Sequence, residues 1–192
     1  MSQSMIRSFI AIDITDEIRD AIGKVSYQIK ANLPGIPLRW VAPQNIHLTL
    51  RFLGEISQDQ ITCLVQNSQA VLTKFSCTTI GFAGIGAFPS SRRARIIWIG
   101  INSSPELSPL ILELNEVLAT CQISKEDKLF SPHLTLCRLR NLSTFDYAKV
   151  NSVLSSLKVG SLGSFQVDSV KLYKSDLTPT GPVYTCIHNF LI

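Results

Sequence analysis

Residues 47–50 of the chain read His-Leu-Thr-Leu, and the same four residues return at positions 133–136. The two copies use two of the three histidines in the sequence. Side chains of a β-strand point alternately to its two faces, so each copy places its histidine and threonine on one face and both leucines on the other. The repeat therefore predicts two half-buried strands that present the same pair of polar groups.

The residues around the first copy extend the alternation over positions 46–53. Apolar side chains at 46, 48, 50 and 52 alternate with His47, Thr49 and Arg51. This period of two predicts one apolar and one polar face, and Gly54 is expected to end the strand.

Strands and helices alternate along the rest of the chain. Ser57 and Gln60 have the spacing of a capping box, and Ser104-Pro105 precedes a broad apolar stripe, so each pair predicts the start of a helix. The expected helices follow Thr15-Asp16 (apolar residues 18–29), Ser57 (61–72), Ser104-Pro105 (107–121) and Thr144 (147–157), and the further strands cover 6–13, 76–82, 95–101, 132–139, 165–173 and 183–191.

The strands alternate in polarity and are not continuous apolar blocks, which favours antiparallel sheets and an α+β fold. The order strand, helix, His-Leu-Thr-Leu strand, helix recurs in both halves of the chain. This recurrence suggests an internal duplication. We expect residues 1–192 to form one domain of two pseudo-symmetric lobes, with flanking helices, around a central cleft that both histidine strands face.

The composition fits a compact soluble protein. The chain has 192 residues, 45% of them hydrophobic, and a net charge of +4, which permits an anionic ligand without the dense basic footprint of a duplex-binding protein. It contains no run of eighteen apolar residues and no secretory leader pattern. A cytoplasmic protein without membrane contact, acting as a monomer, is expected.

The five cysteines are odd in number, widely spaced and without a Cys-x-x-Cys pair. Neither a disulfide framework nor a zinc module is indicated, and a reducing compartment fits best.

Two histidines that face one ligand can divide acid and base work, because the pKa of imidazole is near 6.5 and shifts readily with its surroundings. Threonine hydroxyls add neutral donors for non-bridging phosphate oxygens. The pairing therefore suits phosphodiester cleavage, and cyclic phosphates in particular. From the residues alone, paired catalysis and two ordinary strand histidines inherited through a duplication stay about equally supported.

A metal site is a poorer interpretation of the same residues. Threonine is a weak ligand, and neither copy has an Asp or Glu nearby in phase with its histidine. We expect neither a metal nor another cofactor.

In these residues the chain resembles the two-histidine phosphoesterase superfamily, and specifically the RNA 2′,3′-cyclic phosphodiesterase family long called 2′-5′ RNA ligase. The resemblance covers nearly the whole chain, and the two His-x-Thr motifs are its specific part. The matching segments are residues 7–13, 39–41, 45–54, 86–89, 98–100, 130–138 and 170–175.

The resemblance implies a bilobal α+β fold and metal-independent hydrolysis of RNA 2′,3′-cyclic phosphate ends, or of cyclic nucleotides, to 2′-phosphomonoesters. It implies that His133 accepts a proton from water, that His47 donates one to the leaving oxygen, and that Thr49, Thr135 and Arg138 bind the substrate. Two other functions stay open: a non-catalytic module that binds nucleotides or RNA ends, and 2′-5′ RNA ligation as the main role.

Arginines are less certain members of this site. Strict alternation turns Arg138 away from His133 and Thr135, so it can reach the phosphate only through a bulge, a twist or the end of the strand. Arg51 is in phase with His47, but a solvated strand charge is an equal interpretation, and it is left out of the site.

Other candidates have ordinary structural interpretations. Arg92, Arg93 and Arg95 could follow an RNA backbone or lie on a solvated loop. Trp40 and Phe9 could stack on a base but are better read as core residues. His188 has no threonine two residues on and is read as structural.

Overall fold

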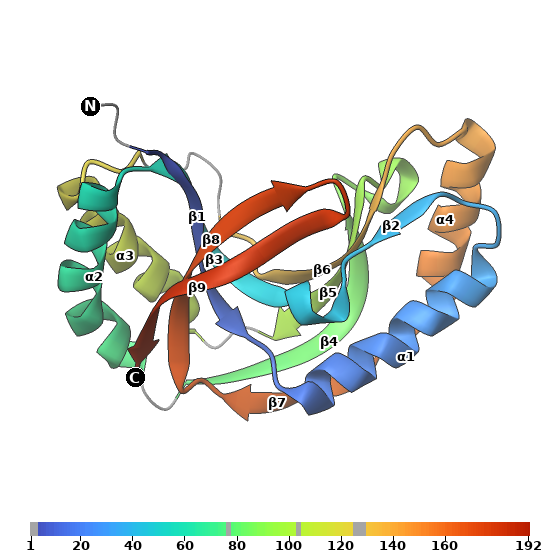
Figure 1. Ribbon diagram of the computed structural model, residues 1–192. Helices are drawn as coiled ribbons and strands as arrows, with labels where there is room; N and C mark the ends of the chain where they lie inside the picture. Colours follow the sequence, from blue (N-terminus) through green and yellow to red (C-terminus); the bar gives the residue numbers. More distant parts are fainter. Residues whose placement is uncertain (1–3, 76–77, 103–104, 125–129) are drawn as a thin grey trace.

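The computed structural model describes residues 4–75, 78–102, 105–124 and 130–192 (Figure 1). Within these ranges the elements follow the order β1 (Ile6–Asp13), α1 (Asp16–Asn32), β2 (Leu38–Trp40), η1 (Pro43–Asn45), β3 (His47–Ile56), α2 (Gln58–Leu72), η2 (Thr73–Phe75), β4 (Thr79–Phe88), η3 (Ser91–Arg93), β5 (Ile96–Asn102), α3 (Leu107–Thr120), β6 (His133–Leu139), α4 (Thr144–Ser156), β7 (Ser161–Gln166), β8 (Ser169–Thr178) and β9 (Gly181–Leu191).

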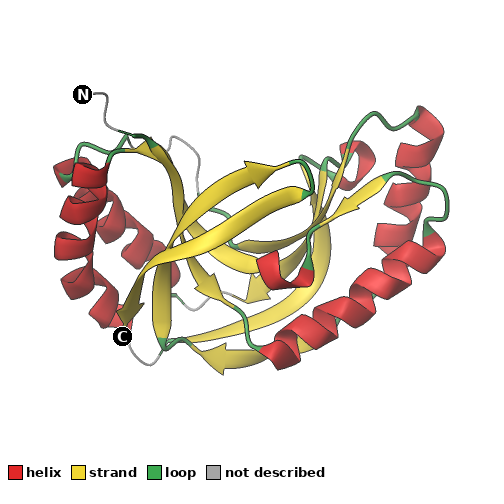
Figure 2. Cartoon of the chain, in the orientation of Figure 1, coloured by secondary structure: helices red, strands yellow, loops and turns green. Residues whose placement is uncertain are grey.

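The strands form two antiparallel sheets, with the orders β3-β1-β8-β9 and β2-β6-β5-β4-β7. Figures 1 and 2 show the strands in the middle of the molecule, with α2 and α3 on one side and α1 and α4 on the other. The expected α+β class, with antiparallel sheets in two lobes, is confirmed.

Each sheet takes strands from both halves of the chain. β1 and β3 from the first half are completed by β8 and β9 from the second, whereas the other sheet combines β2 and β4 from the first half with β6 and β7 from the second, and β5 lies where the halves meet. The two histidine strands hold matching places, because β3 pairs with β1 as β6 pairs with β5. The lobes are therefore pseudo-symmetric in space, but neither lobe is one half of the sequence.

Polar caps begin three of the helices. The hydroxyl of Thr15 accepts the amide hydrogen of Ile18 at the start of α1, and Ser57 with Gln60 forms the predicted capping box of α2. Ser143 and Asp146 form another at α4. The predicted cap Ser104 lies outside the described residues, and α3 begins at Leu107 without a side-chain cap.

A β-bulge interrupts both histidine strands at the same position of the motif, the second leucine. Thr49 pairs with Ala11 and Arg51 with Ile10, so Leu50 is the extra residue in β3. Thr135 pairs with Trp98 and Cys137 with Ile97, so Leu136 is the extra residue in β6. A bulge restarts the alternation, so the residues that follow exchange faces relative to an unbroken strand.

The burial patterns of the two strands follow these bulges. From the histidine onward β3 and β6 both run half-buried, buried, half-buried, buried, buried, exposed, buried. The expected faces are therefore wrong beyond Leu50. Arg51 turns into the core, and Phe52 lies exposed on the face that carries His47 and Thr49. The strand also continues past Gly54, whose φ of 72° follows a second register shift beside Leu53.

Two further expectations about the strands need correction. The single strand expected over 165–173 is two strands, β7 and β8, separated at Val167-Asp168. The short strand β2 carries too few residues to show a period of its own, and it was not among the expected strands. The first two residues of the strand expected over 76–82 lie outside the described residues.

The leucines of both motifs lie in the hydrophobic core. Leu48, Leu50, Leu134 and Leu136 are each 0–3% exposed. Burial of a leucine side chain stabilises the fold by about 1.5–3 kcal/mol, so these four fix which face of each strand turns inward.

A disulfide joins Cys63 on α2 to Cys121, the residue that follows α3. The expectation that no cysteines pair is wrong for these two, and the inference of a reducing compartment loses that support. Their Cα atoms are 5.6 Å apart although 58 positions separate them in sequence, because α2 and α3 pack side by side. Spacing along the chain carries no trace of such a contact.

No helix in the described ranges has both the length and the apolar character needed to span a lipid bilayer.

Candidate active site

The structure brings the two predicted half-sites to neighbouring strands of the two sheets. β3 and β6 contact one another although they belong to different sheets. We call the inner face of each sheet the one that carries the motif histidine and threonine. His47, Thr49, His133 and Thr135 are all half-buried on these inner faces, while the leucines between them turn the other way.

Three aromatic side chains surround His47. Its ring stacks on Phe9 of β1, with centroids 4.8 Å apart and planes 20° apart, and meets the edge of Tyr184 at 5.4 Å. The ring of Tyr173 lies 5.3 Å from that of Phe9 and 6.5 Å from that of His47. Phe9 is only 3% exposed, which confirms it as a core residue and not a free stacking platform.

This apolar surrounding lowers the pKa of His47 to about 4, because burial disfavours the charged ring. The backbone carbonyl of Asn45 and the charge of Asp13 act in the opposite direction. The imidazole of the unliganded protein is therefore neutral near pH 7.

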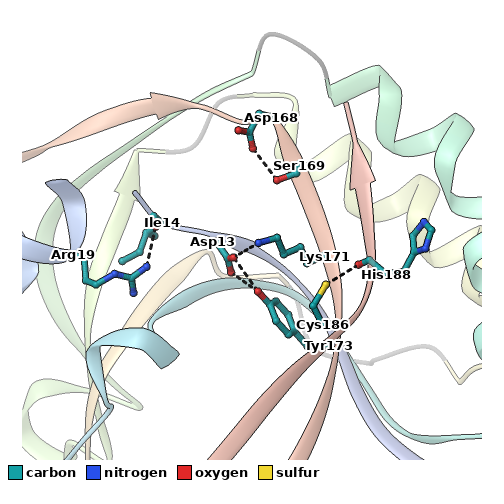
Figure 3. A network of polar contacts seen from close by, with 9 residues as sticks. All are labelled: Asp13, Ile14, Arg19, Asp168, Ser169, Lys171, Tyr173, Cys186 and His188. Atoms are coloured by element: carbon teal, nitrogen blue, oxygen red, sulfur yellow. Dashed lines mark hydrogen bonds and ion pairs between the residues drawn. The ribbon is translucent and has the colours of Figure 1, made fainter. Parts of the chain in front are cut away.

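Asp13 lies opposite His47 in the pairing of β1 with β3. Its carboxylate accepts hydrogen bonds from Lys171 at 2.7 Å and from the Tyr173 hydroxyl at 2.9 Å (Figure 3). The bond to Asp13 raises the pKa of Lys171, and burial together with the same carboxylate raises that of Tyr173. The carboxylate of Asp13, paired with Lys171, thus fixes the position of Tyr173 in the aromatic group around His47.

His133 has a different surrounding but the same backbone support. Its Nδ1–H donates to the carbonyl of Ser131 at 2.7 Å, and because a carbonyl only accepts, Nε2 is the ring nitrogen free to accept a proton. Phe88 meets the ring edge-on at 4.9 Å. In both half-sites the histidine ring therefore bonds the carbonyl two residues before it, from Asn45 or Ser131.

Strict alternation predicts that Arg138 faces away from His133 and Thr135. Because of the bulge at Leu136, Arg138 lies on the same face as these two residues. Cys137 takes the buried side instead, and burial raises the pKa of its thiol to about 12. Arg138 is exposed, and its guanidinium charge opposes the rise that burial causes in the pKa of Tyr184 on the other sheet. Arg138 therefore lies near the aromatic group around His47.

Arg51 occupies the matching place to Cys137 and points away from the site. It is 4% exposed, and its Nη2 donates to the carbonyl of Ser124 at 2.9 Å. This position agrees with the expectation that Arg51 is not a site residue. Strict alternation predicts that Arg51 shares the face of His47, however, and it does not. Phe52, the counterpart of Arg138, is 57% exposed.

The remaining candidates lie elsewhere. Trp40 turns to the face of Cys137, where Lys30 lies 5.3 Å from its ring. His188 meets Phe190 at 4.5 Å on β9. Arg92, Arg93 and Arg95 are exposed around η3.

Asp13, Lys171, Tyr173 and Tyr184 were not among the predicted site residues. The signal for Lys171 and Tyr173 is their shared parity in the segment Val-Lys-Leu-Tyr, and Asp13 shares the parity of Phe9. Placing them beside His47 required the β1–β8 pairing, which no local pattern reveals.

A depression of about 330 Å³ lies elsewhere, between α2 and α3. Its lining comes from those two helices alone, so it has no part in the chemistry of the histidine strands. Among the residues that the structure describes, no three His, Cys, Asp or Glu side chains gather as a metal-binding group.

Comparison with known proteins gives consistent likenesses. The model of the LigT-like phosphoesterase family matches residues 12–98 and again 99–184. The chain is 30% identical over 192 residues to an RNA 2′,3′-cyclic phosphodiesterase of Aquifex aeolicus, covering 98% of both chains. It is 33% identical to a protein of the same name from Methanocaldococcus jannaschii, covering 95% of this chain and 98% of that one.

Among solved structures, LigT of E. coli complexed with 3′-AMP superposes with a TM-score of 0.73 at 25% identity, over 98% of both chains. Complexes of that protein with ATP and with NADP+ are similar at 26% identity, each with a TM-score of 0.68.

Proposed function

Because the chain belongs to the LigT-like phosphoesterase family, we propose that it hydrolyses the 2′,3′-cyclic phosphate at RNA ends to a 2′-phosphomonoester. The observation that carries this proposal is the pair of His-x-Thr half-sites on two strands that contact each other. Relatives that are similar to this chain over nearly its whole length are named RNA 2′,3′-cyclic phosphodiesterases.

In the proposed reaction His133 is the base. Its Nε2 takes a proton from water, whose oxygen attacks phosphorus, while the bond from phosphorus to O3′ breaks and His47 gives its proton to that oxygen. The products are a 2′-phosphate and a free 3′-hydroxyl. The bond from Nδ1 of His133 to Ser131 supports this assignment because it leaves Nε2 free to accept.

Thr49 and Thr135 would donate hydrogen bonds to the two non-bridging oxygens, one from each sheet. Arg138 would add a charged donor, which suits the charge that develops on phosphate oxygens. The bulge at Leu136 supports this role because it places Arg138 on the side of Thr135.

For His47 to act as the acid, substrate binding must load it with a proton. Its ring is neutral near pH 7 in the free protein, and a bound phosphate would favour the charged imidazolium in the same low-dielectric surroundings. Binding of the substrate anion would thus raise the pKa of His47 and favour its protonated, acidic form.

This loading gives a testable pH dependence. We expect the His47 ring to titrate with a midpoint of about 4 in the free protein, and at a clearly higher pH when inorganic phosphate is bound. Histidine NMR shifts followed through both titrations would measure the midpoints, with His188 as an internal control. The alkaline limb of kcat should also lie above that of kcat/KM. A free midpoint near 6.5 would contradict the requirement that substrate binding protonates His47.

Hydrolysis itself is tested by the product. The purified protein, incubated with 2′,3′-cyclic AMP and excess chelator, is expected to release 2′-AMP, resolved from 3′-AMP by chromatography. The chelator arm tests metal independence. Release of 3′-AMP, or loss of activity on chelation, would show a different reaction.

A further inference from the structure

The two half-sites differ in the residue that lies opposite the histidine. Asp13 on β1 is the register partner of His47, so these two side chains extend from the same face of the sheet. The corresponding partner of His133 on β5 is Gly100, which brings no side chain. The backbone pairing of the two half-sites is therefore alike, but the charge next to the ring is not.

Two donors from β8 hold the carboxylate of Asp13. Lys171 lies opposite Ala11, two residues before Asp13 on β1, and its Nζ donates to the carboxylate at 2.7 Å. The hydroxyl of Tyr173 donates to both carboxylate oxygens at 2.9 Å (Figure 3). These bonds restrict the rotation of the carboxylate, so its charge keeps one place beside His47.

Several titratable or charged groups come from the elements around His47. They are Asp13 and Arg7 of β1, Arg19 of α1, Lys171 and Tyr173 of β8, Tyr184 and Cys186 of β9 and Arg138 of β6. The charge of Asp13 favours protonation of the His47 ring. The arginines act on the two tyrosine hydroxyls instead.

We propose that Asp13 is a positioning residue for the proposed acid: its fixed carboxylate stabilises the protonated ring of His47 in the substrate complex, and Lys171 limits that stabilisation as a counter-charge. This inference rests on the proposed function and deepens it by naming the groups that set the strength of the acid. A general acid must hold its proton at the working pH and still release it to the leaving oxygen. An opposed pair of charges beside the ring serves both requirements.

The two members of the pair contribute with opposite signs. Loss of Asp13 removes the charge that favours the imidazolium, whereas loss of Lys171 leaves the carboxylate uncompensated beside the ring. Either loss breaks the same ion pair at 2.7 Å. A purely structural role of the pair therefore predicts the same direction of change in both variants, and the proposal predicts opposite directions.

Histidine NMR shifts, followed through a pH titration with inorganic phosphate bound, test the proposal without turnover. Asp13→Asn is expected to lower the His47 midpoint by about 0.5–1 pH unit, the effect of one charge roughly 6 Å away at an effective dielectric constant of about 40–80. Such a high dielectric constant applies because the Asp13 side chain is 41% exposed. Lys171→Gln is expected to raise the midpoint. Asp13→Glu keeps the charge and should stay closer to the parent than Asp13→Asn.

The alkaline limb of kcat on 2′,3′-cyclic AMP should move in the same directions. At a pH above this limb, Asp13→Asn is expected to be about three- to tenfold slower than the parent, which corresponds to its shifted midpoint. Lys171→Gln should be at least as fast as the parent there, although it breaks the same ion pair.

A second ion pair on β8 provides matched controls. Lys174 and Asp176 lie 3.0 Å apart, and strand parity places both on the face opposite to that of Lys171. Lys174→Gln and Asp176→Asn remove the same kinds of charge from the same strand. Neither should move the His47 midpoint or the limb of kcat.

The two measurements separate this inference from the proposed function. Shifts of the same sign in Asp13→Asn and Lys171→Gln, or no shift in Asp13→Asn, would overturn the role of the pair. Hydrolysis by the parent with such unmoved midpoints leaves the proposed function standing. Opposite shifts in the phosphate complex support the effect of the pair on the ring, even if the parent releases no 2′-AMP and the proposed function fails.

Discussion

Replacement of His47 or His133 by alanine is expected to lower kcat on 2′,3′-cyclic AMP by about 10²–10⁴-fold, the usual contribution of one proton-transfer group. Each variant loses one of the two protons that must move for the P–O3′ bond to break. Initial rates of 2′-AMP release, with protein in excess for the slow variants, would measure the loss.

His188→Ala provides the matched control because it removes the remaining histidine of the chain, which packs on Phe190 in β9. Its kcat should stay within about twofold of the parent. The double variant should be little slower than the worse single variant, since residues that act as a unit are not additive. Near-parent turnover in either single variant would rule out paired acid and base catalysis.

Replacement of Thr49 or Thr135 by valine is expected to lower kcat by about 10²-fold. Valine keeps the branched shape of threonine and removes only the hydroxyl donor, and loss of one preorganised donor to a developing charge costs roughly 10²–10³ in rate. The loss should appear in kcat more than in KM, because the donors would bind the transition state more strongly than the ground state.

Thr185→Val, at an exposed position on β9, tests whether a threonine loss as such matters. It should leave kcat unchanged. Increases in KM alone for the Thr49 and Thr135 variants would assign these hydroxyls to uniform substrate binding and not to the chemical step.

Much of the fold follows from local patterns. The strand at 6–13, the Thr15 cap of α1, the capping box of α2 and the stripe that becomes α3 are confirmed, because each depends on neighbours within one turn or one strand. The polar and apolar faces of the His-x-Thr tetrapeptides also follow directly from alternation.

The two bulges cannot be predicted from such local patterns. The sequence around Leu50 and Leu136 alternates as in a regular strand, and only the pairing with the partner strand shows that one position is skipped. That single skip decides whether Arg51 or Phe52 faces the site, and whether Arg138 or Cys137 does. Strict alternation left Arg138 a bulge, a twist or the end of the strand as ways to the phosphate, and the residues themselves do not show which of these occurs.

The surroundings of His47 were hidden for a related reason. Tyr173 and Tyr184 lie on one hairpin, but they reach Phe9 and His47 only through the pairing of β1 with β8, whose partners are more than a hundred residues apart in sequence. The disulfide between Cys63 and Cys121 depends in the same way on helix packing. Local propensity carries no information about either.

The exchange of strands between the two halves limits how the chain can be divided. The two family-model matches meet at residues 98 and 99, which lie inside β5. A cut there would strip β1 of β8 and β5 of β4, and would leave long open edges ready to pair with other chains. Although the sequence reads as a duplication, each half is an incomplete fragment that buries its edges only by interlocking with the other.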